Sequence, residues 1–167
     1  DGLQIGARHI TVSTCGLVDK IVEYGKLGIQ TNLALSLHAP NDEIRNKIMP
    51  ISRAYSLDKV FTALQEYYAS SGRRVTLEYI MLKGINDSKD NAKELVSLIR
   101  KYGVLCYVNL IPYNEVKEMP FKRSPISTCK EFATILMQNG INATIRKEFG
   151  GDIDAACGQL RIKVGAK

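Results

Sequence analysis

Short apolar segments typical of β-strands alternate along this chain with amphipathic segments typical of α-helices. The strand-type segments are residues 9–14, 32–37, 75–82, 105–112 and 141–146. The helix-type segments are residues 18–26, 42–48, 57–70, 89–102 and 126–139. Strands that are joined through helices pair in parallel by right-handed crossovers, so the alternation predicts an α/β fold with about five mostly parallel strands. Five strands are too few for a closed eight-stranded barrel, which leaves a partial (β/α) barrel or a sheet with strands missing.

Local signals mark several boundaries of these segments. Asn41 and Ser56 each precede a helix-type segment, where their side chains can cap free backbone N–H groups. Gly103 follows residues 89–102, as expected at the left-handed end of a helix. Residues 32–37 (NLALSL) form a nearly continuous apolar run, which predicts a strand covered on both faces.

Composition narrows the class of protein. The 167 residues fit a single domain, and 45% hydrophobic with 24% charged residues is typical of a soluble globular protein. No apolar run is long enough to span a bilayer. The net charge of +6 permits a polyanionic partner such as RNA but does not require one. The four cysteines form no C-x-x-C pair, so we expect neither a zinc site nor a disulfide framework, and a reduced intracellular compartment fits best.

Polar residues follow four of the predicted strands. They lie in segments 13–16 (STCG), 36–40 (SLHAP), 81–87 (MLKGIND) and 109–114 (NLIPYN). Ligands of parallel α/β folds bind at the carboxyl ends of the strands, so these segments are expected to converge on one binding edge. Their neutral donors and acceptors suit a nucleoside or an amino-acid group better than a bare phosphate. No G-x-G-x-x-G or Walker A loop is present.

Each of these segments also has a purely structural interpretation. Ser13 and Thr14 can cap the helix that follows them. His38 can be a turn histidine whose hydrogen bonds are satisfied within the protein. Asn86 favours a turn by itself, and Asn114 can simply hold a loop.

Cys157 lies between small residues in segment 150–160 (GGDIDAACGQL). Glycines on both sides can place the thiol on a mobile segment, where its chemistry rather than its packing would matter. The alternative is a small buried residue near a frayed terminus. Cys15 is interpreted as a packing residue, and Cys106 and Cys129 as core residues of a strand and a helix.

Six segments resemble, in the same order, the RlmN/Cfr family of dual-specificity RNA methyltransferases, which are radical S-adenosylmethionine enzymes. They are ITVSTCGLV (10–18), NLALSLHAPND (32–42), IMPI (48–51), EYIMLKGIND (78–87), VNLIPYN (108–114) and DIDAACGQL (152–160). These segments cover nearly the whole chain, and neither SLHAPND nor DIDAACGQL is a generic solution to a packing problem. The resemblance implies that residues 1–167 are one domain, the carboxyl-terminal part of a catalytic domain, with a partial barrel that lacks its first strands.

The resemblance also implies roles for individual residues. Contacts with S-adenosylmethionine would come from Ser13, Ser36, Leu37, His38 and Asn114. Cys157 would be the catalytic cysteine that becomes S-methylated. In the family, a [4Fe–4S] cluster cleaves a second S-adenosylmethionine, and the methylated cysteine then delivers its carbon to C2 of an adenine in large-subunit ribosomal RNA or transfer RNA. The resemblance further implies an electron donor such as flavodoxin, no membrane, and a cytoplasmic location, or an organelle in a eukaryote.

Parts of the family pattern are missing from this chain. The cluster motif C-x-x-x-C-x-x-C, the resolving cysteine and a G-E-P segment lie upstream in the family. We therefore expect no metal ligands here and no activity of residues 1–167 alone, and we expect the chain either to self-associate through an exposed sheet edge or to cover that edge. Three alternatives stay open: a C8-methylating relative, a cluster-less RNA- or ligand-binding module, and a radical enzyme with another substrate, against which DIDAACGQL argues.

Overall fold

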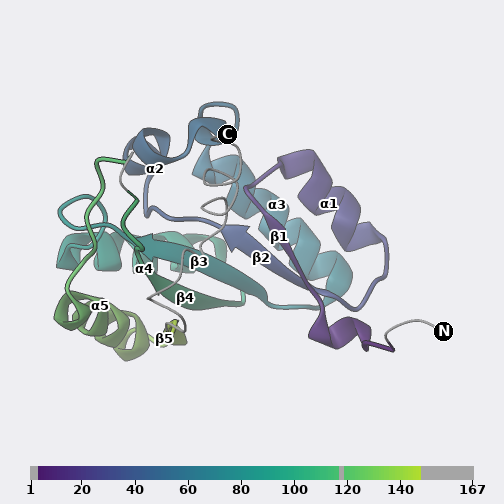
Figure 1. The fold of residues 1–167 in the computed structure, drawn as a ribbon. Helices are drawn as coiled ribbons and strands as arrows, with labels where there is room; N and C mark the ends of the chain where they lie inside the picture. The colour runs from purple at the N-terminus through teal and green to yellow at the C-terminus, as the bar shows by residue number, and fades with distance from the viewer. Residues whose placement is uncertain (1–3, 117–118, 148–167) are drawn as a thin grey trace, which may run out of the picture.

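Five parallel strands form one sheet in the order β1-β2-β3-β4-β5 (Figure 1). This computed structural model describes residues 4–116 and 119–147. The strands are β1 (Thr11–Thr14), β2 (Asn32–Ser36), β3 (Val75–Met81), β4 (Cys106–Pro112) and β5 (Ala143–Ile145). All four pairings between neighbours are parallel. The predicted α/β fold with about five parallel strands is therefore confirmed.

Helices connect the strands at the places that the sequence pattern predicts. They are α1 (Val18–Lys26), α2 (Asp42–Ile48), α3 (Leu57–Ser71), α4 (Lys89–Tyr102) and α5 (Ile126–Gln138), with short 3₁₀ turns η1 (Ala7–His9) and η2 (Pro50–Arg53). The Asn41 side chain caps α2 by accepting a hydrogen bond from the N–H of Ile44 at 2.9 Å. Gly103 ends α4 with a φ of 57°. These local signals explain why the predicted bounds of α2 and α4 agree with the structure.

The hydrophobic core lies between one face of the sheet and the helices. Leu35, Leu77, Val108 and Ala143 are paired in register across four strands, and all belong to the core cluster that includes residues of α1, α3, α4 and α5. Side chains alternate between faces along a strand, so the residues next to these point to the opposite face. That opposite face is the one available to carry polar chemistry.

The middle of β2 agrees with its prediction as a strand covered on both faces. Leu33, Ala34 and Leu35 are all buried. Asn32 and Ser36 at the two ends of the strand are only half-buried. Within residues 4–116 and 119–147, no helix is long and apolar enough to cross a bilayer.

Helices α1 and α3 approach each other closely at Gly25. A Cβ atom at this position would lie 3.1 Å from the Cα of Tyr67 on α3. The rings of Tyr24 and Tyr67 stack beside this contact, with centroids 6.3 Å apart. The absence of a side chain at Gly25 therefore sets how closely the two helices pack.

Substitution Gly25→Leu is expected to lower the free energy of unfolding by about 2 kcal/mol, because the new side chain must displace the backbone of α3. Urea denaturation followed by circular dichroism measures this change. The matched control is Lys26→Leu, which adds similar apolar volume to an exposed position of the same helix. Equal losses in the two variants would mean that the close approach at Gly25 does not limit the packing.

Candidate functional site

The residues predicted to bind a ligand lie at or near the carboxyl ends of β1, β2 and β4. Ser13 is exposed within β1, Ser36 is half-buried at the end of β2, Leu37 is buried, His38 is half-buried, and Asn114 is exposed just after β4. Neighbouring parallel strands run in the same direction, so these positions share one edge of the sheet. We call this edge, with the loops that follow β1 to β4, the carboxyl edge.

The structure brings some of these residues together on the face away from the helices. Ser13 pairs in register with Ala34, two residues before Ser36, so both serines belong to the same face. The side chain of Leu37 instead lies in the hydrophobic core. Only the backbone of Leu37 is therefore available for a ligand contact. Asn114 makes no hydrogen bond to the other predicted residues in the part of the chain that the structure describes.

His38 is held in an uncommon backbone conformation, with a φ of 60°. Its Nδ1 accepts a hydrogen bond from the N–H of Ile80 at 3.2 Å, and its carbonyl accepts one from Nδ2 of Asn86 at 2.8 Å. Burial, and secondarily the nearby charge of Arg45, lowers the pKa of His38 to about 4. The imidazole is therefore neutral at pH 7. Because Nδ1 is an acceptor, the proton is assigned to Nε2, which can donate to a ligand.

Arg45 on α2 is completely buried beneath this edge and was missed by the sequence analysis. Its guanidinium donates from Nη2 to the carbonyls of Cys15 (2.9 Å) and Ser36 (3.3 Å) and from Nε to the carbonyl of Leu37 (3.2 Å). It thereby joins the loop after β1 to the end of β2. Its Nη1 is buried without a hydrogen-bond partner within the described residues. Nothing in the charged sequence DEIRNKI distinguishes this arginine from its solvent-exposed neighbours.

Asn86 fixes the other side of the loop that carries His38. Its side-chain Nδ2 donates to the carbonyls of His38 (2.8 Å) and Ile80 (2.7 Å), while Oδ1 accepts from the N–H of Leu82 (2.8 Å). Asn86 is fully buried. The simple turn that the sequence indicates is thus also a hydrogen-bonded connection between the ends of β2 and β3.

A polar row crosses the sheet on the face away from the helices. Ser36, Glu78, Asn109 and Thr144 are paired in register across β2, β3, β4 and β5. Nδ2 of Asn109 donates to the Glu78 carboxyl at 2.8 Å. Burial raises the pKa of Glu78, opposed by this hydrogen bond and by the charge of Arg146. The sequence could have pointed to Glu78, because it is a carboxylate within the apolar segment VTLEYIM. Its partners in the polar row could not have been identified, because they depend on the register of the strands.

The alternative role of Ser13 and Thr14 as helix caps was wrong. Helix α1 has Leu17 at its N-cap position and no side-chain cap. Oγ1 of Thr14 instead accepts a hydrogen bond from the N–H of Gly16 at 3.1 Å within the loop. The side chains of Ser13 and Thr14 therefore do not cap helix α1.

The cysteines of the described residues do not form a reactive or metal-binding group. Cys129 is buried and Cys15 and Cys106 are half-buried, which fits the packing roles predicted for them. Burial raises the pKa of Cys106 to about 12, so its thiol stays protonated at neutral pH. Among the described residues, no three His, Cys, Asp or Glu side chains are grouped as a metal site requires. Cys157, the predicted catalytic residue, lies outside the described residues.

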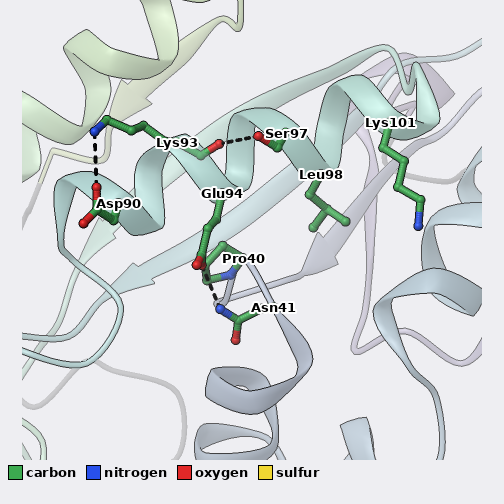
Figure 2. A pocket seen from close by; sticks show the side chains of 8 residues that line it. All are labelled: Pro40, Asn41, Asp90, Lys93, Glu94, Ser97, Leu98 and Lys101. Atoms are coloured by element: carbon green, nitrogen blue, oxygen red, sulfur yellow. Dashed lines mark hydrogen bonds and ion pairs between the residues drawn. The ribbon is translucent and has the colours of Figure 1, made fainter.

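A surface groove lies along α4, and its lining includes none of the individual residues predicted to bind a ligand (Figure 2). It is lined by Pro40, Asn41, Asp90, Lys93, Glu94, Ser97, Leu98 and Lys101. Nδ2 of Asn41 donates to Oε2 of Glu94 at 2.7 Å across the groove. The groove is open and mostly lined by exposed side chains of one helix. We therefore assign the candidate site to the carboxyl edge, where the buried hydrogen bonds converge.

Substitution Arg45→Met is expected to lower the free energy of unfolding by about 3 kcal/mol, because buried carbonyls of two loops lose a charged donor. Urea denaturation measures the loss, and amide NMR shifts should change first at Cys15 and Leu37. Arg53→Met is the control, since Arg53 is exposed. A loss below about 0.5 kcal/mol in Arg45→Met would show that the guanidinium does not hold the edge.

His38 makes the stability of the fold depend on pH. Its pKa falls from 6.5 to about 4 on folding, so between these values the unfolded chain binds more protons than the folded one. The His38 contribution to stability is therefore complete above pH 6.5 and is lost as the pH falls to about 4. The variant His38→Asn has a residue that tolerates the positive φ. We expect its free energy of unfolding to fall by about 2 kcal/mol less than that of wild type when the pH is lowered through this range.

Urea titrations at several pH values test this expectation as the difference between wild type and variant. His9→Asn is the matched control, because His9 is exposed and is the other of the two histidines. The interpretation of His38 as a buried neutral imidazole fails if His38→Asn and wild type lose stability in parallel between pH 7 and pH 4.

Comparison with known proteins finds relatives that are named as RNA methyltransferases, although no family model matches this chain. A probable dual-specificity RNA methyltransferase RlmN of Streptococcus agalactiae is 55% identical over 162 residues, which are 96% of this chain and 44% of that protein. The protein of the same name in Malacoplasma penetrans is 59% identical over 162 residues, 97% of this chain and 45% of its own length. The chain thus spans less than half the length of these curated relatives.

Solved structures agree with this placement. The crystal structure of a radical SAM methyltransferase from Sphaerobacter thermophilus matches 95% of this chain and 46% of its own, with a TM-score of 0.89 and 47% identity. A domain of a pyruvate-formate lyase-activating enzyme from Bacteroides vulgatus has a TM-score of 0.61 at 15% identity, covers 82% of this chain and 80% of its own, and supports the fold alone. The predicted partial barrel of the radical S-adenosylmethionine type is confirmed, and the chain belongs to the RlmN/Cfr family.

Proposed function

We propose that this chain forms part of a radical S-adenosylmethionine enzyme that methylates C2 of adenine in large-subunit ribosomal RNA and transfer RNA. The observation that carries the proposal is the identity of 55% over 96% of this chain to a protein named as a dual-specificity RNA methyltransferase. The structural likeness to a radical SAM methyltransferase, with a TM-score of 0.89, supports the same chemistry. An RNA substrate also suits the net charge of +6.

The carboxyl edge fits S-adenosylmethionine in the chemistry of its side chains. Hydroxyl groups of Ser13 and Ser36, Nε2 of His38 and the amide of Asn114 are neutral groups that can hydrogen-bond to a nucleoside and an amino acid, and Leu37 can contribute its backbone. The buried hydrogen bonds of Arg45 and Asn86 fix the loops that carry Ser36 and His38. S-adenosylmethionine, when bound, supplies an electrophilic methyl group and the source of a carbon-centred radical.

The described residues do not fit an iron–sulfur cluster. Cluster iron is ligated by several cysteine thiolates held together, and residues 4–116 and 119–147 contain no such group. We propose that the ligands of a [4Fe–4S] cluster, and the contact with an electron donor such as flavodoxin, belong to a segment outside this chain. Residues 1–167 would then form one domain that is inactive alone and works in the cytoplasm.

Cys157 is the proposed methyl carrier. Adenine C2 is electron-poor and does not attack a methyl donor, whereas a cysteine thiolate is a strong nucleophile. A thiolate can therefore accept the methyl group first and present it to the base afterwards. The two glycines before Cys157 in sequence, Gly150 and Gly151, would give this segment the freedom to serve both partners.

Exposure at the β1 end of the sheet supports a proposed self-association of the isolated chain. Among the described residues, strand β1 pairs with β2 alone, and Ile10 just before β1 and Val12 within it are 41% and 38% exposed. A strand that has one unpaired edge and exposed apolar side chains tends to pair with another chain. In a longer protein, a further strand could occupy the same position.

Mass spectrometry of the full-length gene product tests the methyl-carrier role. The protein is expressed together with iron–sulfur assembly proteins, and the peptide that contains Cys157 is analysed. We expect one added methyl group on the Cys157 sulfur in wild type and none in Cys157→Ala, because only a thiolate at this position would accept it. RNA from cells expressing each protein should contain C2-methyladenine with wild type only.

The control is Cys15→Ala, which removes a half-buried thiol near the carboxyl edge and should leave the Cys157 methyl group in place. Methylation at C8 of adenine, with Cys157 still methylated, would replace the C2 assignment by the alternative regiochemistry. An unmodified Cys157 in cluster-loaded protein would refute the carrier role and favour an RNA- or ligand-binding module.

A further inference from the structure

A second polar groove lies at the opposite end of the sheet from the carboxyl edge. Its lining includes Arg8, Gln30, Ser70, Ser71 and Arg73. Arg8, Gln30 and Arg73 precede β1, β2 and β3 respectively, and the two serines end α3. The groove therefore lies at the amino-terminal ends of the strands, and we call it the amino-edge groove. It shares no residue with the candidate site.

Two guanidinium groups line this groove without a carboxylate to neutralise them. No Asp or Glu is among the lining residues, which the structure describes in full. Every ion pair found between described residues uses a lysine as its cation. Arg8 and Arg73 consequently keep their positive charges available for an external anion.

Neutral amide groups hold the two arginines in place. Asn32 at the start of β2 donates from Nδ2 to the carbonyl of Arg8 at 2.8 Å, and its Oδ1 accepts from Nη2 of Arg73 at 2.7 Å. Oε1 of Gln30 accepts from Nε of Arg8 at 3.0 Å. Amide oxygens orient a guanidinium but do not cancel its charge. Asn32 thus links the backbone of Arg8 to the guanidinium of Arg73, two residues that are far apart in sequence and line the same groove.

Arg73 also carries an unfulfilled hydrogen-bonding group. Its Nε is buried and has no partner among the described residues. An arginine near the carboxyl end of a helix can serve only to balance the helix dipole. Here, however, the guanidinium of Arg73 donates to Asn32 on the sheet. At the end of the helix, Oγ of Ser71 accepts a hydrogen bond from the backbone N–H of Arg73 and not from its side chain. The partly desolvated charge of Arg73 would be stabilised by an anion in the groove.

We propose that the amino-edge groove binds a phosphate-type oxyanion. Arginine suits this ligand because its fork of N–H donors matches phosphate oxygens. Space is available, since a Cβ atom at the lining residue Gly28 would meet no atom within 4 Å. The phosphate could belong to an RNA backbone or to free phosphate. The first source rests on the proposed function, whereas phosphate binding itself does not.

Titration of the full-length gene product with inorganic phosphate at low ionic strength, followed by calorimetry or NMR, tests the site. Arg73→Gln and Arg8→Gln should each weaken phosphate binding about tenfold, because a charge-assisted hydrogen bond is lost. Gln30→Glu should have a similar effect while preserving the acceptor for Arg8, because its carboxylate competes with phosphate. This near-isosteric variant keeps the test valid if an arginine variant fails to fold.

Arg53→Gln is the matched control, an exposed arginine outside the groove. Its phosphate affinity should equal that of wild type. If the groove variants bind phosphate as tightly as wild type does, the proposal is overturned. Arg8 and Arg73 then only support the sheet edge.

Binding of a short RNA to the same variants distinguishes the two sources of phosphate. If the ligand is an RNA backbone, Arg73→Gln and Gln30→Glu weaken RNA binding, and each lost contact reduces the slope of log affinity against log salt by about one. Phosphate should then also compete with RNA. Unchanged RNA affinity together with lost phosphate affinity identifies free phosphate as the ligand. This binding readout is independent of methylation, so failure of the proposed function would not be confused with failure of this site.

Discussion

The buried guanidinium of Arg45 is the contact on which the carboxyl edge of the sheet depends. One side chain binds backbone carbonyls of Cys15, Ser36 and Leu37, and thereby connects the loop after β1 to the end of β2. A buried cation is costly unless it is hydrogen-bonded, and here neutral carbonyls accept from Nε and Nη2 in place of a carboxylate partner. The same positive charge helps to keep His38 neutral. A residue that touches no proposed ligand therefore sets both the geometry and the protonation of those that do.

One face of the sheet packs in the hydrophobic core, and the other face carries the polar row. Odd-numbered residues of β2 and β3, such as Leu35 and Leu77, pack against the helices in the hydrophobic core. Their neighbours Ser36 and Glu78 form the polar row on the other face. Because one alternation produces both faces, a shift of one residue in register would bury Glu78 in the core and expose Leu77. The hydrophobic core thus fixes the position of the polar row.

The sequence predicted most of the fold because its signals are local. Helices α2 and α4 agree in both bounds, since Asn41 and Ser88 cap them and Gly103 ends α4. Predicted strands differ by one to three residues at their ends, where pairing with a neighbour rather than composition decides the boundary. The convergence of polar segments on one edge follows from parallel pairing and was predictable as well. The burial of Arg45 was not, because it depends on carbonyls of two distant loops.

Arginine side chains lie at both ends of the sheet, but in different environments. At the carboxyl edge, Arg45 is enclosed and donates from Nε and Nη2 to the protein's own backbone, and the side chains of Ser36 and His38 beside it are neutral. At the amino-edge groove, Arg8 and Arg73 are held by the amides of Gln30 and Asn32, and their charges remain uncompensated. A neutral edge suits a nucleoside and an amino acid, whereas a cationic groove suits phosphate.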